Sequence, residues 1–169
     1  MSIDVAVQDN FLKLKDYHEI YNYFMSANPM WGFNTSVKYG GSGEQNSNLD
    51  DFQFVNVLYH NGTINSDGFN ILSPILDKIK PRALLRIKAN LVPRLHKIVE
   101  HEMHIDYHWD DSITSVFYVN TNNGYTKFKD GTKVDSVGNR LVTFPSTIEH
   151  CGTTCTDTKS RVVLNFNYF

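Results

Sequence analysis

Two imidazoles and one carboxylate stand at spacings that suit a metal site. His104 and Asp106 are separated by a single residue, so on a strand both would share one face while Ile105 turns into the packing. His150 follows 44 residues after Asp106. Two imidazoles and one carboxylate can occupy a triangular face of an octahedral Fe(II) ion and leave three neighbouring positions open. Those positions suit a bidentate 2-oxo acid and dioxygen.

The last predicted strand, 161–168, indicates where these ligands would sit. One face carries Val162, Leu164, Phe166 and Tyr168, and the other carries Arg161, Val163, Asn165 and Asn167. Segment 113–120 has a similarly polar face. An apolar outer face and a polar inner face predict helices on the outside of the sheet and a solvated cavity within it. Arg161 would point into that cavity, where a guanidinium binds a carboxylate through two charge-assisted hydrogen bonds.

The elements that must position these residues differ between the two parts of the chain. The N-terminal part predicts strands over 3–8 and 53–59 and amphipathic helices over 14–27 and 67–80. After Pro81 the predicted elements are short strands over 83–92, 113–120, 125–128, 140–144 and 161–168. Segment 40–51 is polar and rich in turn residues, which predicts a mobile loop. We therefore expect an all-β sandwich or barrel with the N-terminal helices packed on its outside.

Composition limits the class of protein. The chain has 169 residues, 41% of them apolar, with a net charge of -2. This length suits one domain, and this charge argues against a protein that coats nucleic acid. No apolar run approaches the roughly 20 residues that span a bilayer. The first ten residues hold two aspartates and no basic segment, so we expect no secretory signal.

The two cysteines and a run of basic residues each allow two interpretations. Cys151 and Cys155 could close a five-residue loop, but two reduced thiols in a reducing compartment are the simpler interpretation, so we expect a cytoplasmic protein. Between Lys78 and Lys97 there are seven Lys or Arg residues and no Asp or Glu. Solvated faces are the usual explanation of such a run, and a patch that attracts an anionic partner is the alternative.

Each candidate site residue also has an ordinary structural explanation. His104 and Asp106 could form a salt bridge on a strand, Arg161 could pair with an aspartate, and Tyr118 could be plain core. A zinc site on a helix is a further alternative. However, the two histidines of His101-Glu102-Met103-His104 stand one residue too close together for the zincin spacing. We expect His101 and His108 at the surface or behind the ligands.

Taken together, the motifs resemble a known family. The matching stretches are His104-Ile105-Asp106, 115–120, 124–128, 139–145, His150 and 161–165, and the opening 7–12 followed by a helix. They resemble the Fe(II)- and 2-oxoglutarate-dependent oxygenases of the prolyl-4-hydroxylase-like type, above all small single-domain versions from marine bacteriophages and bacteria.

This resemblance implies a mainly β chain with flanking helices and a double-stranded β-helix (jelly-roll) core. It implies a single domain over 1–169, with the N-terminal strand and supporting helices in 1–82 and the core in 83–169. His104, Asp106 and His150 would ligate Fe(II). Arg161 and Tyr118 would hold the distal carboxylate of 2-oxoglutarate and Thr126 would line its pocket. Asn165, on the strand of Arg161, would be a further residue of the co-substrate site. Val92 stands where many relatives carry a second tyrosine facing 2-oxoglutarate.

The implied activity is a dioxygenase reaction that uses O2 and converts 2-oxoglutarate to succinate and CO2. The first expected substrate is a peptidyl proline or another protein side chain. Nucleic acid or a small metabolite is the alternative substrate, and a non-catalytic, cupin-like metal-binding module is the alternative to an enzyme. The oligomeric state is open.

Overall fold

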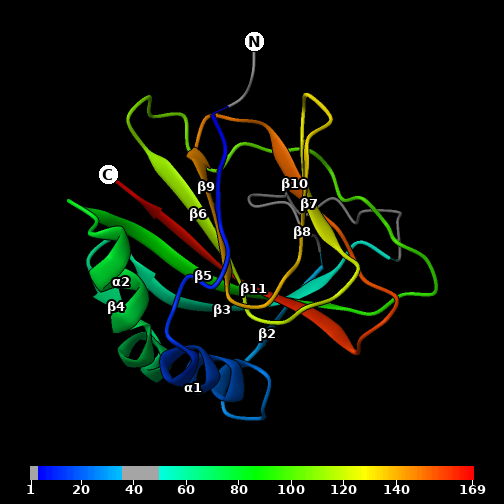
Figure 1. Cartoon of the computed structure of the whole chain (residues 1–169), viewed down its shortest axis with the longest axis horizontal. Helices are drawn as coiled ribbons and strands as arrows, with labels where there is room; N and C mark the ends of the chain where they lie inside the picture. Colours follow the sequence, from blue (N-terminus) through cyan, green and yellow to red (C-terminus); the bar gives the residue numbers. More distant parts are fainter. Residues whose placement is uncertain (1–3, 36–49) are drawn as a thin grey trace.

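A large antiparallel sheet forms the frame of the molecule. The computed structural model describes residues 4–35 and 50–169, so most of the predicted loop 40–51 lies outside the described residues. The sheet holds β1 (Ala6–Gln8), β2 (Gly32–Asn34), β3 (Gln53–His60), β4 (Thr63–Ile64), β5 (Leu84–Pro93), β6 (Ile113–Tyr118), β9 (Arg140–Pro145) and β11 (Ser160–Tyr168). Their order is β1-β9-β6-β11-β5-β3-β2, with β4 on β3. The long strand β11 therefore lies between β5 and β6 (Figure 1).

A smaller sheet faces part of the large one. It consists of β7 (Tyr125–Phe128), β8 (Lys133–Asp135) and β10 (His150–Gly152) in the order β10-β7-β8. Apolar side chains between the two sheets form a compact cluster: Val116, Tyr118, Phe128, Val134, Val142, Phe144 and Val163. This sandwich confirms the predicted jelly-roll class with flanking helices.

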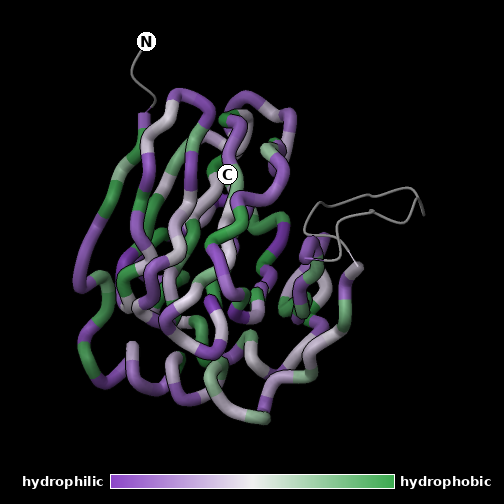
Figure 2. Tube along the Cα trace, turned by 90° about the vertical axis from the view of Figure 1, so that its right-hand side faces the viewer, coloured by the Kyte–Doolittle hydropathy of each residue, from purple (hydrophilic) through white to green (hydrophobic). Residues whose placement is uncertain are grey.

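Helices cover the outer face of the large sheet. They are α1 (Leu14–Phe24), a 3-10 helix η1 (Asp67–Leu72) and α2 (Ser73–Ile79), which gather on one side of it (Figure 1). Val162, Leu164 and Phe166 of β11 are buried in the same cluster as Ile20 and Phe24 of α1. Hydropathy alternates along the strands, as Figure 2 shows. The outward apolar face predicted for β11 is therefore confirmed.

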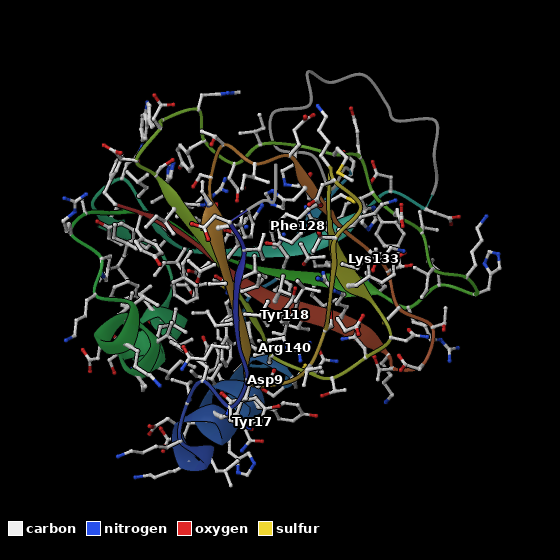
Figure 3. The ribbon with its side chains drawn as sticks, turned by 45° about the horizontal axis from the view of Figure 1, so that its top comes forward. Asp9, Tyr17, Tyr118, Phe128, Lys133 and Arg140 are labelled. Carbon is white, nitrogen blue, oxygen red and sulfur yellow. The ribbon has the colours of Figure 1, made fainter. Side chains whose placement is uncertain are left out.

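Long-range polar contacts tie the N-terminal segment to the sheet. Arg140 of β9 binds both carboxylate oxygens of Asp9, at 2.6 and 3.0 Å, and the two side chains lie together in Figure 3. The hydroxyl of Tyr17 on α1 donates to the Val119 carbonyl at 3.1 Å. The first contact fixes the segment before α1 to β9, and the second fixes α1 to the residue that follows β6.

Some of the observed helices and strands differ from those predicted from local sequence patterns. The predicted helix 67–80 is a 3-10 helix followed by an α-helix that begins with Ser73-Pro74, because proline is favoured in the first helical turn. The short strands β2, β4, β8 and β10 were not predicted. None of the helices formed by the described residues is long and apolar enough to cross a membrane.

Candidate metal and co-substrate site

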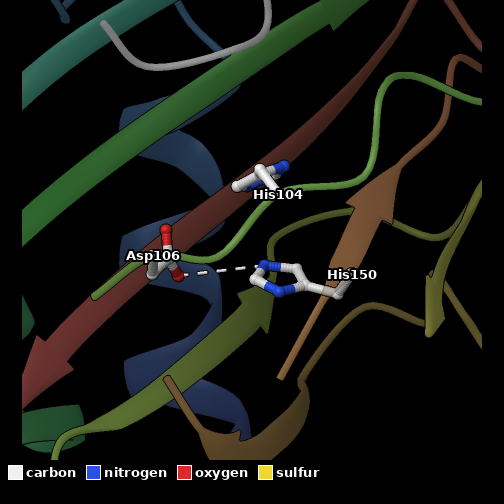
Figure 4. A group of neighbouring side chains, drawn as sticks. All are labelled: His104, Asp106 and His150. Carbon is white, nitrogen blue, oxygen red and sulfur yellow. Dashed lines mark ion pairs between the residues drawn. The ribbon is translucent and has the colours of Figure 1, made fainter. Parts of the chain in front are cut away.

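Three side chains from two segments that are distant in sequence meet at one end of the sandwich. His104 and His150 form an isolated antiparallel bridge, with backbone hydrogen bonds of 2.9 and 3.0 Å in the two directions. Asp106 lies beside them, and one ligand atom from each of the three residues falls within 4.8 Å of the others (Figure 4). Asp106 follows in a bend, so the pairing of His104 with His150, and not the predicted regular strand, positions these ligands.

The protonation of both imidazoles suits metal binding. Nδ1 of His150 lies 2.9 Å from the Ile148 carbonyl oxygen, and Nδ1 of His104 lies 3.3 Å from that of Glu102. A carbonyl oxygen only accepts hydrogen bonds, so each Nδ1 carries the proton and each Nε2 keeps its lone pair. Burial, reinforced by the facing His150 ring, lowers the pKa of His104 and favours the neutral form that a metal needs.

The Asp106 carboxylate is held by four donors. Arg86 Nη2 donates to Oδ1 at 3.0 Å. Oδ2 accepts from Thr114 at 2.9 Å, Asn167 at 3.1 Å and Asn165 at 3.3 Å. Burial by itself would raise the pKa of Asp106, but the neighbouring His150 and Arg86 outweigh that effect and hold the pKa well below its usual range. The group is therefore a fixed carboxylate at neutral pH.

A cavity of about 510 Å³ extends from this cluster along the inner face of the sheet. β5 and β11 contribute three directly paired positions to its lining. These pairs are Lys88–Asn165, Asn90–Val163 and Val92–Arg161. Arg161 stands four residues along β11 from Asn165, roughly 13 Å at 3.3 Å per residue. The cavity is thus long enough for a small dicarboxylate between the His-Asp-His cluster and Arg161.

Arg161 is buried and held by neutral hydroxyl groups. Its Nε donates to Ser136 at 2.8 Å and its Nη2 to Thr126 at 3.2 Å. The Tyr118 hydroxyl donates to the same Thr126 oxygen at 2.8 Å. Thr126 lines the cavity, whereas Tyr118 is fully buried outside its lining and supports Thr126. Direct contact between Tyr118 and a bound carboxylate stays a prediction.

The cavity lining has hydrogen-bonding capacity that the described residues leave unused. Among the described residues, three buried side-chain polar atoms have no partner: Asn90 Oδ1, His101 Nε2 and Asn165 Oδ1. All three residues line this cavity. Because buried polar groups in native proteins are nearly always paired, such a cluster indicates a bound polar ligand. The donor set and these atoms therefore fit a metal and a polar co-substrate.

The interpretation of the 78–97 run as solvated faces was wrong for two of its cations. Arg86 and Lys88 on β5 are 4% and 7% exposed and line the cavity. They alternate with Ile87 and Ala89, which face the helices. The same period of two that predicts the inner face of β11 therefore predicts an inward position for Arg86 and Lys88. Burial, followed by the charge of Arg86, lowers the pKa of Lys88 to about 8.

The structure also shows where the two remaining histidines of this region and the two cysteines lie. His101 is not at the surface but buried beside Asp51, while His108 is exposed at the cavity rim. Residues 101–108 contain no helix, which excludes the helical zinc alternative. Cys151 and Cys155 are both buried free thiols.

Comparison with solved structures identifies the family of folds to which the chain's overall fold is similar. No protein-family model and no curated protein matches the sequence. A Pseudomonas putida prolyl-4-hydroxylase structure matches with TM-score 0.63 and 14% identity, over 99% of this chain and 92% of that one. A Trichoplax adhaerens prolyl hydroxylase, in complex with a hypoxia inducible factor peptide fragment, matches with TM-score 0.65 and 14% identity, over 99% and 84%.

A third match is viral. The collagen prolyl hydroxylase of Paramecium Bursaria Chlorella virus-1, in its 2-oxoglutarate complex, matches with TM-score 0.59 and 10% identity, over 96% of this chain and 94% of that one. The chain therefore has the fold of the prolyl-4-hydroxylase-like Fe(II)/2-oxoglutarate oxygenases.

Proposed function

We propose that the protein is an Fe(II)- and 2-oxoglutarate-dependent dioxygenase. The observation that carries this proposal is the position of two imidazoles and one carboxylate at one end of a cavity that reaches a buried Arg161. The fold it shares with known oxygenases supports the same conclusion.

In this proposal His104, Asp106 and His150 hold Fe(II) through the Nε2 atoms and the carboxylate. The bound ion, with 2-oxoglutarate and O2, supplies oxidative decarboxylation to succinate and CO2 coupled to oxidation of a C–H bond. Arg161 binds the distal carboxylate, and Thr126 lines its pocket. Tyr118 fixes Thr126 by its hydrogen bond.

Asn165 and Arg86 have positioning roles in this proposal. Both donate to Asp106, one to each carboxylate oxygen. Outer partners of this kind orient a metal-binding carboxylate and tune its basicity. Asn165 therefore acts on the metal end of the cavity, four residues from the strand position of Arg161.

For the substrate we propose a peptidyl proline or another protein side chain. The peptide bound in the Trichoplax structure shows that this fold can accept a peptide, which supports the proposal. The second candidate is an anionic substrate, either nucleic acid or a small metabolite. The buried cations Arg86 and Lys88 on the cavity wall favour this alternative.

The buried free thiols suit a reducing compartment, and we infer a cytoplasmic setting in a bacterial or phage-infected cell. A non-catalytic metal-binding module would share the barrel and the three ligands but would not turn over 2-oxoglutarate. Turnover of the co-substrate therefore separates the two functions.

The first test is succinate formation by the purified protein. We expect succinate when Fe(II), 2-oxoglutarate and O2 are all present, and background levels when any one of them is omitted. Stimulation by proline-containing peptides would support the protein substrate. Stimulation by a small carboxylate or by an oligonucleotide, weakening with rising salt, would support the anionic alternative. If metal binds without succinate forming under any of these conditions, the metal-binding module is correct.

A further inference from the structure

Besides His104 and His150, another histidine is buried in the cavity wall, outside the metal cluster. His101 is 7% exposed, and its Nδ1 lies 3.1 Å from a carboxylate oxygen of Asp51. An ionised carboxylate only accepts, so Nδ1 carries the proton that it donates to Asp51. The other ring nitrogen, Nε2, is buried without a hydrogen-bond partner in the described part of the chain. Within the described residues, His101 is therefore oriented through Nδ1, whereas Nε2 has no partner.

Backbone pairing places His101 beside Gly152, which itself adjoins Arg161. The His101 N–H donates to the Gly152 carbonyl at 3.1 Å. A Cβ atom on Gly152 would lie 3.2 Å from Arg161 Nη1, so the absence of a side chain there leaves room beside that nitrogen. Nε and Nη2 of Arg161 donate to Ser136 and Thr126, and Nη1 is the nitrogen that adjoins this space. His101 and Arg161 both line this cavity, and the charge of Arg161 acts on the His101 ring.

We propose that His101 is a second binding residue for the distal carboxylate of 2-oxoglutarate, donating from Nε2 beside Arg161 Nη1, with Asp51 holding the ring in place. This inference rests on the proposed function. Among the described residues, it assigns a role to the one buried histidine of the cavity lining that lies outside the cluster of His104, Asp106 and His150. It also supplies a donor in a cavity where Val92 offers none.

The role requires the ring to gain a proton when the ligand binds. Burial lowers the pKa of His101, Asp51 raises it, and Arg161 lowers it again, with a net lowering. These are the charged groups that act on the ring within the described residues, and they leave it neutral at neutral pH. A carboxylate bound at Nε2 favours the imidazolium, so the pKa of His101 rises on binding and a proton is taken up. The affinity for 2-oxoglutarate should consequently fall as the pH rises above neutral.

Calorimetric titration of the Mn(II)-loaded protein tests this role without turnover. His101→Phe should weaken 2-oxoglutarate binding by about 10- to 100-fold, the effect of one charge-assisted hydrogen bond. Binding of 2-oxobutyrate, which lacks the distal carboxylate, should not change. His96→Phe, at an exposed histidine, is the matched control and should bind as the wild type does. Equal affinity of His101→Phe and wild type for 2-oxoglutarate overturns the inference.

Proton uptake gives a readout that a purely structural role would not move. Titrations in two buffers with different heats of ionisation should show proton uptake by the wild type and none by His101→Phe. Asp51→Asn should keep the fold but weaken 2-oxoglutarate binding in the same direction. Uptake that persists in His101→Phe contradicts the assignment. If the wild-type protein binds neither 2-oxo acid, the proposed function itself fails, which is a distinct outcome.

Discussion

Replacement of Asp106 by alanine is expected to abolish iron-dependent succinate formation. Asp106 is the one carboxylate in the cluster with His104 and His150, and two imidazoles by themselves hold Fe(II) weakly. The change also removes the carboxylate that faces the buried Arg86 guanidinium at 3.0 Å. Breaking such a buried pair destabilises a protein by about 3–5 kcal/mol. Metal titration and chemical denaturation measure the two effects separately.

A second substitution separates folding from metal binding. The double variant Arg86→Met with Asp106→Ala removes both charges, so stability should recover in part while metal affinity stays lost. Asp110→Ala, at an exposed acid four residues along the same segment, should leave both properties unchanged. Full iron-dependent turnover by a folded Asp106→Ala protein would exclude Asp106 as a ligand.

Replacement of Arg161 by alanine is expected to weaken 2-oxoglutarate binding by at least about 100-fold while metal affinity changes little. A buried guanidinium binds a carboxylate through charge-assisted hydrogen bonds, each stabilising by about 1.5–3 kcal/mol. The partners that remain, Ser136 and Thr126, are neutral hydroxyls and cannot replace the charge. Calorimetry with 2-oxoglutarate on the Mn(II)-loaded variant measures the change.

Arg161→Lys should recover part of the affinity, since it restores the charge but not the planar fork. Arg94→Ala, at an exposed arginine outside the cavity, is the matched control. If Arg161→Ala and wild type bind 2-oxoglutarate equally well, Arg161 does not bind the co-substrate.

Much of the frame and of the site was predictable because the relevant signals are local. The period of two along β11 is visible in the sequence, and it correctly placed Leu164 towards the helices and Arg161 towards a cavity. The residues His104, Asp106 and His150 were identified from ligand chemistry and family resemblance. The structure brings them together through a bridge between His104 and His150.

What could not be predicted depends on contacts between distant segments. Asp51 and His101 are 50 residues apart, and no local pattern joins them. The four-donor setting of Asp106 likewise draws on separate strands. Arg86 and Lys88 are a different case, because their alternation with apolar residues was present in the sequence but a run of cations is usually solvated.

The most direct test of the central claim is an anaerobic titration of the metal-free protein with Fe(II) and then 2-oxoglutarate. Chelation of iron by the 2-oxo acid produces a weak visible charge-transfer band. The wild-type protein should show this band, Arg161→Ala should show it only weakly, and Asp106→Ala should not show it. A wild-type protein that binds Fe(II) but never develops the band with excess 2-oxoglutarate would contradict the assignment of this cavity to an oxygenase.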